Sequence, residues 1–70
     1  MNDFWDLFQT FHERYEEKYR WPCLWHCELY GNGKGAWHDA AGDHVATFYS
    51  LDEAMNLLRV FAKERHNIEV

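Results

Sequence analysis

The first twenty residues carry large apolar side chains at the spacing of an amphipathic helix. Members of this stripe recur three or four positions apart, and they are Phe4, Leu7, Phe8, Phe11, Tyr15 and Tyr19. Asn2 or Asp3 is expected to cap the start of the helix. Pro22 disfavours helical backbone at Trp21, so we expect the helix to end near Arg20.

Apolar and mixed positions then alternate, which predicts a first strand over residues 21–29. The odd positions are expected to face the core, and they are Trp21, Cys23, Trp25, Cys27 and Leu29. The even positions are mixed in character, so the second face of this strand is expected to be covered only in part.

Two turns and two further strands follow. The stretch Gly31-Asn32-Gly33-Lys34-Gly35 contains Asn-Gly and repeated glycine, which supply the positive φ angles of a tight hairpin. A second strand is predicted over residues 36–39 and a reversal over residues 40–43. A third strand is predicted over residues 44–49, which are rich in β-branched and aromatic side chains.

A second helix is predicted to start at the capping box Ser50-Leu51-Asp52-Glu53. Its apolar face consists of Ala54, Leu57, Leu58, Phe61 and Ala62. Asn67 is a suitable residue to end it.

These elements predict one α+β domain over residues 1–70, with the order αβββα. Two amphipathic helices and one sheet bury their apolar faces most simply when both helices pack on one face of a three-stranded antiparallel sheet. The other face of the sheet is then open to solvent or to a partner.

The order of elements resembles that of double-stranded-RNA-binding domains, and the resemblance is one of topology. Those domains carry a basic cluster at the start of the last helix, whereas this chain has Leu51-Asp52-Glu53-Ala54-Met55 there. The net charge of −5 also opposes contact with phosphates, so no direct nucleic-acid binding is expected.

The same composition limits location and chemistry. No apolar run approaches the length of a membrane span, and the first residues lack the pattern of a signal peptide, so a cytoplasmic protein without membrane contact is expected. Two cysteines are too few for a disulfide scaffold. No set of acid, base or nucleophile converges visibly, so we expect no enzymatic activity and no cofactor.

Cys23, Cys27, His38 and His44 form the most distinct chemical pattern of the chain. Thiolates and imidazoles are the ligands that zinc prefers, and two His flanking a hairpin turn are placed to approach one ion. Both cysteines lie within the apolar stripe of the first strand, where a thiol is more often a core side chain. A zinc-stabilised module is therefore an alternative interpretation, and no metal is assigned.

The aromatic content favours an interaction surface. The chain has four Trp, four Tyr and five Phe, more than a small core needs, so some of the rings are expected to be exposed. We expect Tyr30 or Trp37 to anchor a partner, with acidic side chains supplying charge complementarity. These acids are Asp3, Asp6, Glu13, Glu16, Glu17, Asp39, Asp43, Asp52 and Glu53.

The resulting hypothesis is a small, acidic, non-enzymatic module that binds a larger protein or a protein–nucleic-acid complex. In size and acidity the chain resembles anti-CRISPR proteins, which implies a phage-type inhibitor whose carboxylates stand where phosphates would bind. A structural homodimer formed through the uncovered sheet face is a further alternative.

Overall fold

The computed structural model describes residues 3–70, so the expected cap Asn2 lies outside the described residues. The elements follow in the predicted order and are α1 (Asp3–Tyr19), β1 (His26–Gly31), β2 (Lys34–His38), β3 (His44–Phe48) and α2 (Leu51–His66). The predicted α+β fold with αβββα order is therefore confirmed.

The three strands form one antiparallel sheet in the order β1-β2-β3. The predicted hairpin turn joins β1 to β2, and Gly31, Asn32 and Gly33 all have positive φ angles there. Within the pair, His26 lies opposite His38 and Cys27 lies opposite Trp37. Since successive side chains alternate between faces, Trp37 and His38 point to opposite sides of the sheet.

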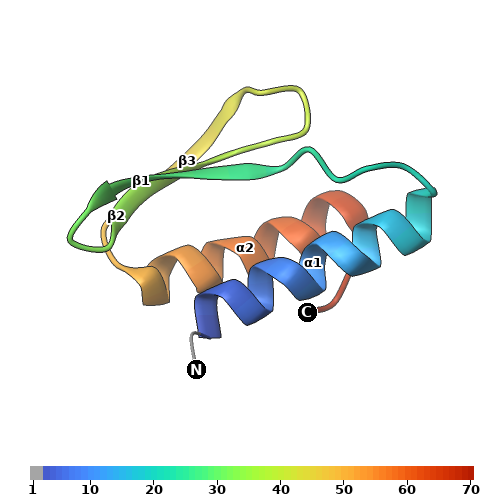
Figure 1. Cartoon of the computed structure of the whole chain (residues 1–70), viewed down its shortest axis with the longest axis horizontal. Helices are drawn as coiled ribbons and strands as arrows, with labels where there is room; N and C mark the ends of the chain where they lie inside the picture. The colour runs from blue at the N-terminus through green and yellow to red at the C-terminus, as the bar shows by residue number, and fades with distance from the viewer. Residues whose placement is uncertain (1–2) are drawn as a thin grey trace.

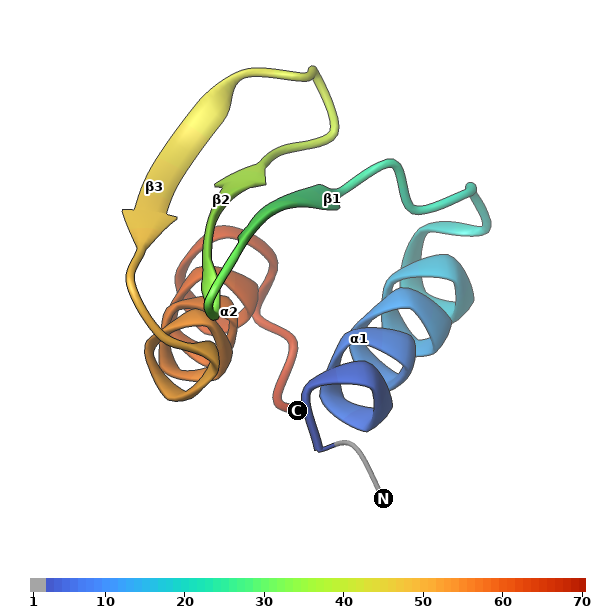
Figure 2. The ribbon, with the colours of Figure 1, turned by 60° about the vertical axis from the view of Figure 1, so that its left-hand side comes forward.

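Both helices lie on the same side of the sheet (Figure 1). Helix α2 packs against β2 and β3, and α1 packs alongside α2. The helices run parallel to one another, with both starts at the same end of the molecule, as two views show (Figures 1 and 2). The reason is topological: three antiparallel strands return the chain to the end where α1 began.

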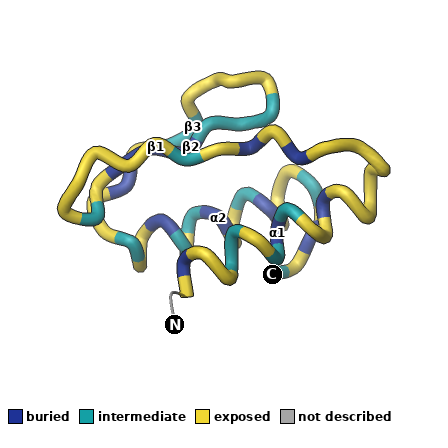
Figure 3. The backbone as a smooth tube through the Cα atoms, in the orientation of Figure 1, coloured by how far each residue is buried: buried dark blue, intermediate teal, exposed yellow. Residues whose placement is uncertain are grey.

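The core fills the space between the helices and the sheet, and the buried positions of these layers face one another (Figure 3). Its largest fully buried side chains are Trp25, Trp37, Phe11, Phe48 and Leu58. The Trp37 ring stacks on that of Phe4, with centroids 5.8 Å apart, and the Phe11 ring meets Trp25 edge-on at the same separation. Large rings thus compensate for the small number of core residues that a short chain offers.

Helix boundaries follow the predicted local chemistry. Helix α1 ends one residue before Arg20, which adopts a left-handed φ of 56°. At the start of α2 the amide of Glu53 donates to the Ser50 hydroxyl over 3.1 Å. Asn67 ends α2 in the left-handed conformation, as expected.

The first strand begins five residues later than predicted, so that prediction was wrong for residues 21–25. This stretch connects α1 to β1, and the Cys23 amide donates to the Glu16 carboxylate over 3.1 Å. Cys23 and Trp25 enter the core, as alternation requires, but Trp21 is 64% exposed. An extended connection that covers the end of a helix thus produces the same alternation as a paired strand.

The chain after α2 crosses toward α1. Ile68 is buried in the core, and two basic side chains of α1 hold the backbone of this tail. Arg14 donates to the carbonyl oxygen of Glu69, and Lys18 donates to that of His66. The position of α1 therefore depends on residues 66–70.

Across residues 3–70, no helix has both the length and the apolar content that crossing a membrane would need.

Candidate functional site

Four of the predicted partner-binding acids gather at one end of the molecule. Asp3 and Asp6 lie in the first turn of α1, and Asp52 and Glu53 lie in the first turn of α2. Because the helices are parallel, these two turns lie at the same end (Figures 1 and 2). All four side chains are exposed, and we refer to this region as the acidic end.

Three exposed aromatic residues belong to the same end by their place in the chain. Trp5 is in the first turn of α1, and Tyr49 directly precedes the cap of α2. Tyr30 comes just before the β1–β2 turn, and this turn lies close to the start of α2. The closeness is seen at Gly33 of the turn, where an added Cβ atom would lie 3.6 Å from the Leu51 amide nitrogen. Each ring is more than half exposed. Tyr30 is therefore exposed, and its role as an anchor stays a prediction.

The remaining acids of α1 lie farther along the helix. Glu13 and Glu17 are exposed on the surface, and Glu13 accepts a hydrogen bond from Gln9 over 3.2 Å. Glu16 is also exposed, but its carboxylate holds the Cys23 amide and so helps to fix the connection after α1. These three residues do not belong to the acidic end.

Asp39 and Asp43 lie in the β2–β3 loop, where Asp39 has a structural role. One Asp39 carboxylate oxygen accepts from the amides of Asp43 and Ala41, each over 3.0 Å, and the other lies 3.3 Å from Arg65 of α2. The pKa of Asp39 lies below its ordinary value, mainly because the carboxylate accepts a hydrogen bond from the Asp43 amide. The Ala41 amide and Arg65 lower this pKa further. Asp39 therefore lies near the C-terminal end of α2, away from the acidic end.

Trp37 was predicted to be a surface anchor, and this prediction was wrong. Its exposed fraction is 0%, and its indole nitrogen donates to the Ala54 carbonyl oxygen over 2.9 Å. The residue lies on the central strand and faces the helices, so its ring is surrounded by core side chains. It joins β2 to α2 instead of reaching a partner.

The predicted zinc set is not brought together. Cys23 lies in the core, and Cys27 is opposite Trp37 on the side of the sheet that faces the helices. His38, the next residue along β2, points to the outer face, and His44 is paired with it there. Burial, followed by the charge of Glu28, raises the pKa of Cys27 to about 11, which disfavours the thiolate that a metal needs. Thiols and imidazoles are therefore separated by the sheet.

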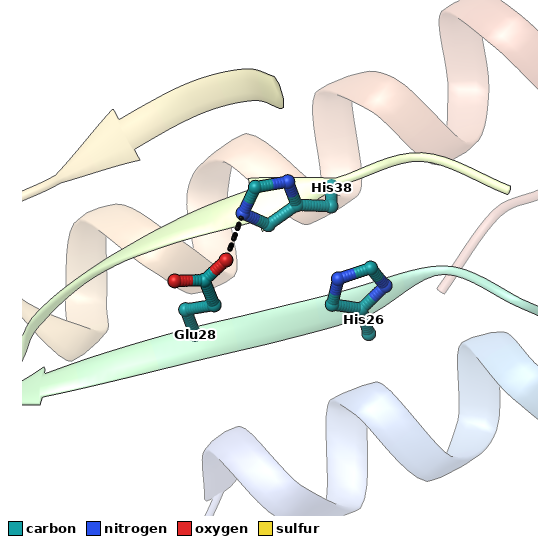
Figure 4. A group of neighbouring side chains, drawn as sticks. All are labelled: His26, Glu28 and His38. Carbon is teal, nitrogen blue, oxygen red and sulfur yellow. Dashed lines mark ion pairs between the residues drawn. The ribbon is translucent and has the colours of Figure 1, made fainter. Parts of the chain in front are cut away.

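The outer face carries a different group of ligand-type side chains that sequence reasoning missed. His26, Glu28 and His38 each place one ligand-type atom within 4.8 Å of the others (Figure 4). Glu28 and His38 form an ion pair over 2.8 Å. Counting residues back and forward from the Asn32-Gly33 turn would have paired position 27 with position 38. The register shift between Leu29 and Gly31 brings His26 opposite His38 instead, and no signal in the sequence marks that shift.

Beside this group, Thr47 of β3 pairs with Ala36 of β2. A homodimer formed through this face stays a prediction.

No family model, curated protein or solved structure matches the chain.

Proposed function

We propose that the chain is a non-enzymatic binding module that docks its acidic end onto a basic surface of a larger protein. The observation that carries the proposal is the parallel arrangement of α1 and α2, which brings their acidic first turns together (Figure 1). Each turn alone would be an ordinary helix start. Together they place four exposed carboxylates at one end of the molecule.

The acids at this end also have a role within the fold. A carboxylate in the first turn of a helix interacts favourably with the helix dipole, by about 0.3–1 kcal/mol at an exposed site. This role requires only that each helix start be acidic, and it would be met equally by antiparallel helices. Convergence of the two starts at one end adds a surface property that helix stability does not require.

The exposed rings supply what charge alone lacks. Tyr and Trp are enriched among the residues that dominate binding energy, because they bury much area with little loss of side-chain freedom. Trp5 and Tyr49 are exposed in or directly before the first turns of the two helices, and Tyr30 is exposed just before the β1–β2 turn. We propose that these rings anchor the partner while the carboxylates select and orient it.

The more specific form of the proposal is a phage-type inhibitor, similar in style to anti-CRISPR proteins. A nucleic-acid-handling protein presents Lys and Arg to phosphates, and carboxylates at one end of this chain would meet the same cations. The partner would then lose its nucleic acid when it binds this chain.

The test compares two variants of equal charge. The first removes three of the four negative charges of the acidic end with Asp6→Asn, Asp52→Asn and Glu53→Gln. The second removes the same number of charges elsewhere on the helices with Glu13→Gln, Glu17→Gln and Glu64→Gln, all of which are exposed. Each tagged protein is used to capture partners from a nuclease-treated prokaryotic lysate at low and high salt, and captured proteins are identified by mass spectrometry.

We expect a basic protein that is captured by the wild type and by the second variant but is lost with the first variant and at high salt. Exposed charge pairing is screened over about 10 Å at 0.1 M salt, which explains the salt dependence. Equal capture by both variants, or loss with the second variant only, would refute a role for the acidic end. Nucleic-acid binding by the purified partner, measured with and without this chain, then decides the inhibitor version.

A further inference from the structure

We propose that His26, Glu28 and His38 bind a divalent transition-metal ion, such as Zn²⁺, on the outer face of the sheet. This site lies on the opposite side of the sheet from the helices and does not depend on the acidic end. It also differs from the Cys–His set that the sequence suggests, because only His38 is common to both.

The strands place the three side chains on one face. His26 and His38 are direct cross-strand partners in the β1–β2 pair, and Glu28 lies two residues along β1 from His26. Directly paired residues have Cβ atoms about 4.5–5.5 Å apart, a separation from which two imidazoles reach one ion. The ligands are thus carried by two hydrogen-bonded strands, which fix their relative positions (Figure 4).

The donor set indicates the kind of ion. Two imidazole nitrogens and one carboxylate oxygen suit Zn²⁺, Ni²⁺ or Cu²⁺, whereas Ca²⁺ and Mg²⁺ prefer ligand sets made of oxygen alone. Three protein ligands on an exposed face leave at least one position of the ion open to water.

The environment of His38 favours a ligand role. Its side chain is only 14% exposed, and its Nε2 atom is shielded from solvent. The Glu28 carboxylate lies 2.8 Å from this nitrogen, but the pair lacks the geometry of a hydrogen bond. A metal ion between the two groups would satisfy both the nitrogen lone pair and the carboxylate.

His26 is also held in a suitable form. Its Nδ1 lies 3.4 Å from the carbonyl oxygen of Leu24, an arrangement that favours a proton on Nδ1 and leaves Nε2 for a ligand. Metal-bound histidines are commonly oriented in this way by a backbone carbonyl.

Closing the site requires a small movement. The His26 and His38 rings are stacked, with centroids 4.8 Å apart and an angle of 4° between their planes. Tetrahedral ligands about 2.0–2.1 Å from zinc lie roughly 3.4 Å from one another, so the rings must tilt toward a common point. His26 and Glu28 are exposed and have room for this movement.

The experiment is a titration of the purified full chain, without a histidine tag, with Zn²⁺ by calorimetry. We expect one equivalent per chain, and at least a roughly tenfold weaker association in His26→Gln and in Glu28→Gln, since even outer-shell changes cost metal sites 10–100-fold. Both substituted residues are exposed, and circular dichroism checks that each variant is folded. The melting temperature of the wild type should rise with Zn²⁺, and this rise should be lost in both variants.

His44→Gln is the matched control, because His44 is on the same face and its ring lies 5.8 Å from that of His38. It should bind Zn²⁺ as the wild type does. The proposal is overturned by the absence of stoichiometric binding, by unchanged binding in His26→Gln or Glu28→Gln, or by an equal loss in His44→Gln. Histidine side-chain NMR gives a second reading, in which Zn²⁺ should shift the ring resonances of His26 and His38 and leave those of His12 unchanged.

Discussion

Replacement of Trp37 by Phe tests whether this residue joins the sheet to α2. The indole nitrogen donates to the Ala54 carbonyl oxygen over 2.9 Å in a fully buried position, so the variant loses a hydrogen bond worth about 1 kcal/mol. A phenyl ring also leaves a cavity of roughly 40 Å³, which at ~24 cal/mol per Å³ adds about 1 kcal/mol. We therefore expect Trp37→Phe to lower the free energy of unfolding by about 2 kcal/mol.

This loss is large for so short a chain. At about 0.05–0.15 kcal/mol per residue, a domain of this size has a total stability of roughly 4–10 kcal/mol. Trp37→Ala should cost about 3–5 kcal/mol and leave the domain marginally stable or unfolded. An exposed anchor would show neither effect.

Urea unfolding followed by circular dichroism is the appropriate assay, because fluorescence changes when a Trp is removed. Trp21→Phe is the matched control, since Trp21 is 64% exposed and its replacement should change stability by less than about 0.5 kcal/mol. If both variants unfolded at the same urea concentration, the proposed link between β2 and α2 through Trp37 would be refuted.

Two further predictions concern the sheet and the response to pH. Gly35→Ala should cost about 3 kcal/mol or more in urea unfolding, because its new Cβ would lie 2.1 Å from the Glu28 carbonyl oxygen and 2.7 Å from Phe48. Gly42→Ala, which meets nothing within 4 Å but has a φ of 87°, should cost only about 1–2 kcal/mol, and equal costs would contradict the packing argument. The pKa of His66 is lowered by burial and then by the charges of Lys18 and Arg65. Below about pH 6.5 the unfolded chain therefore binds a proton at this residue that the folded chain does not, and the free energy of unfolding decreases as the pH falls through the lowered pKa. His66→Gln should therefore weaken the pH dependence of stability between about pH 7 and pH 5, and an unchanged slope would contradict this assignment.

The helices were predictable because their residues decide them locally. The spacing of Phe4, Phe11 and Tyr15 specifies one buried face, and the Ser50 and Asn67 caps specify where α2 starts and ends. The hairpin turn was equally predictable, since Asn32-Gly33 provides the required backbone conformation. These features depend on interactions within a few residues.

Burial of individual rings was not predictable from composition. The number of aromatic residues indicated that some are exposed, and Trp5, Trp21, Tyr30 and Tyr49 are. It could not show that Trp37 is buried, because that depends on β2 being the central strand under α2. Long-range packing decided this outcome.

The candidate metal ligands depended on register. Cys27 seemed a partner for His38 by its residue type, but a strand residue shares a face only with particular positions on its neighbour. His38 is paired with His26, and a shift of one residue moves every side chain to the other face. Eight of the nine acidic residues named from the sequence are exposed, and Asp39 is half-buried. The placement of four of them at one end depends on the parallel helices.

The hydrogen bonds between α1 and the C-terminal tail affect how the chain folds while it is being synthesised. Helix α1 leaves the ribosome before α2, Ile68 and the carbonyl groups that Arg14 and Lys18 contact. At about 5–20 residues per second, the roughly 50 intervening residues take on the order of 3–10 s. During that time the Phe4–Tyr15 stripe has no completed surface to cover it, and a 17-residue helix is only marginally stable alone. The nascent chain therefore presents this apolar stripe to chaperones before it can fold.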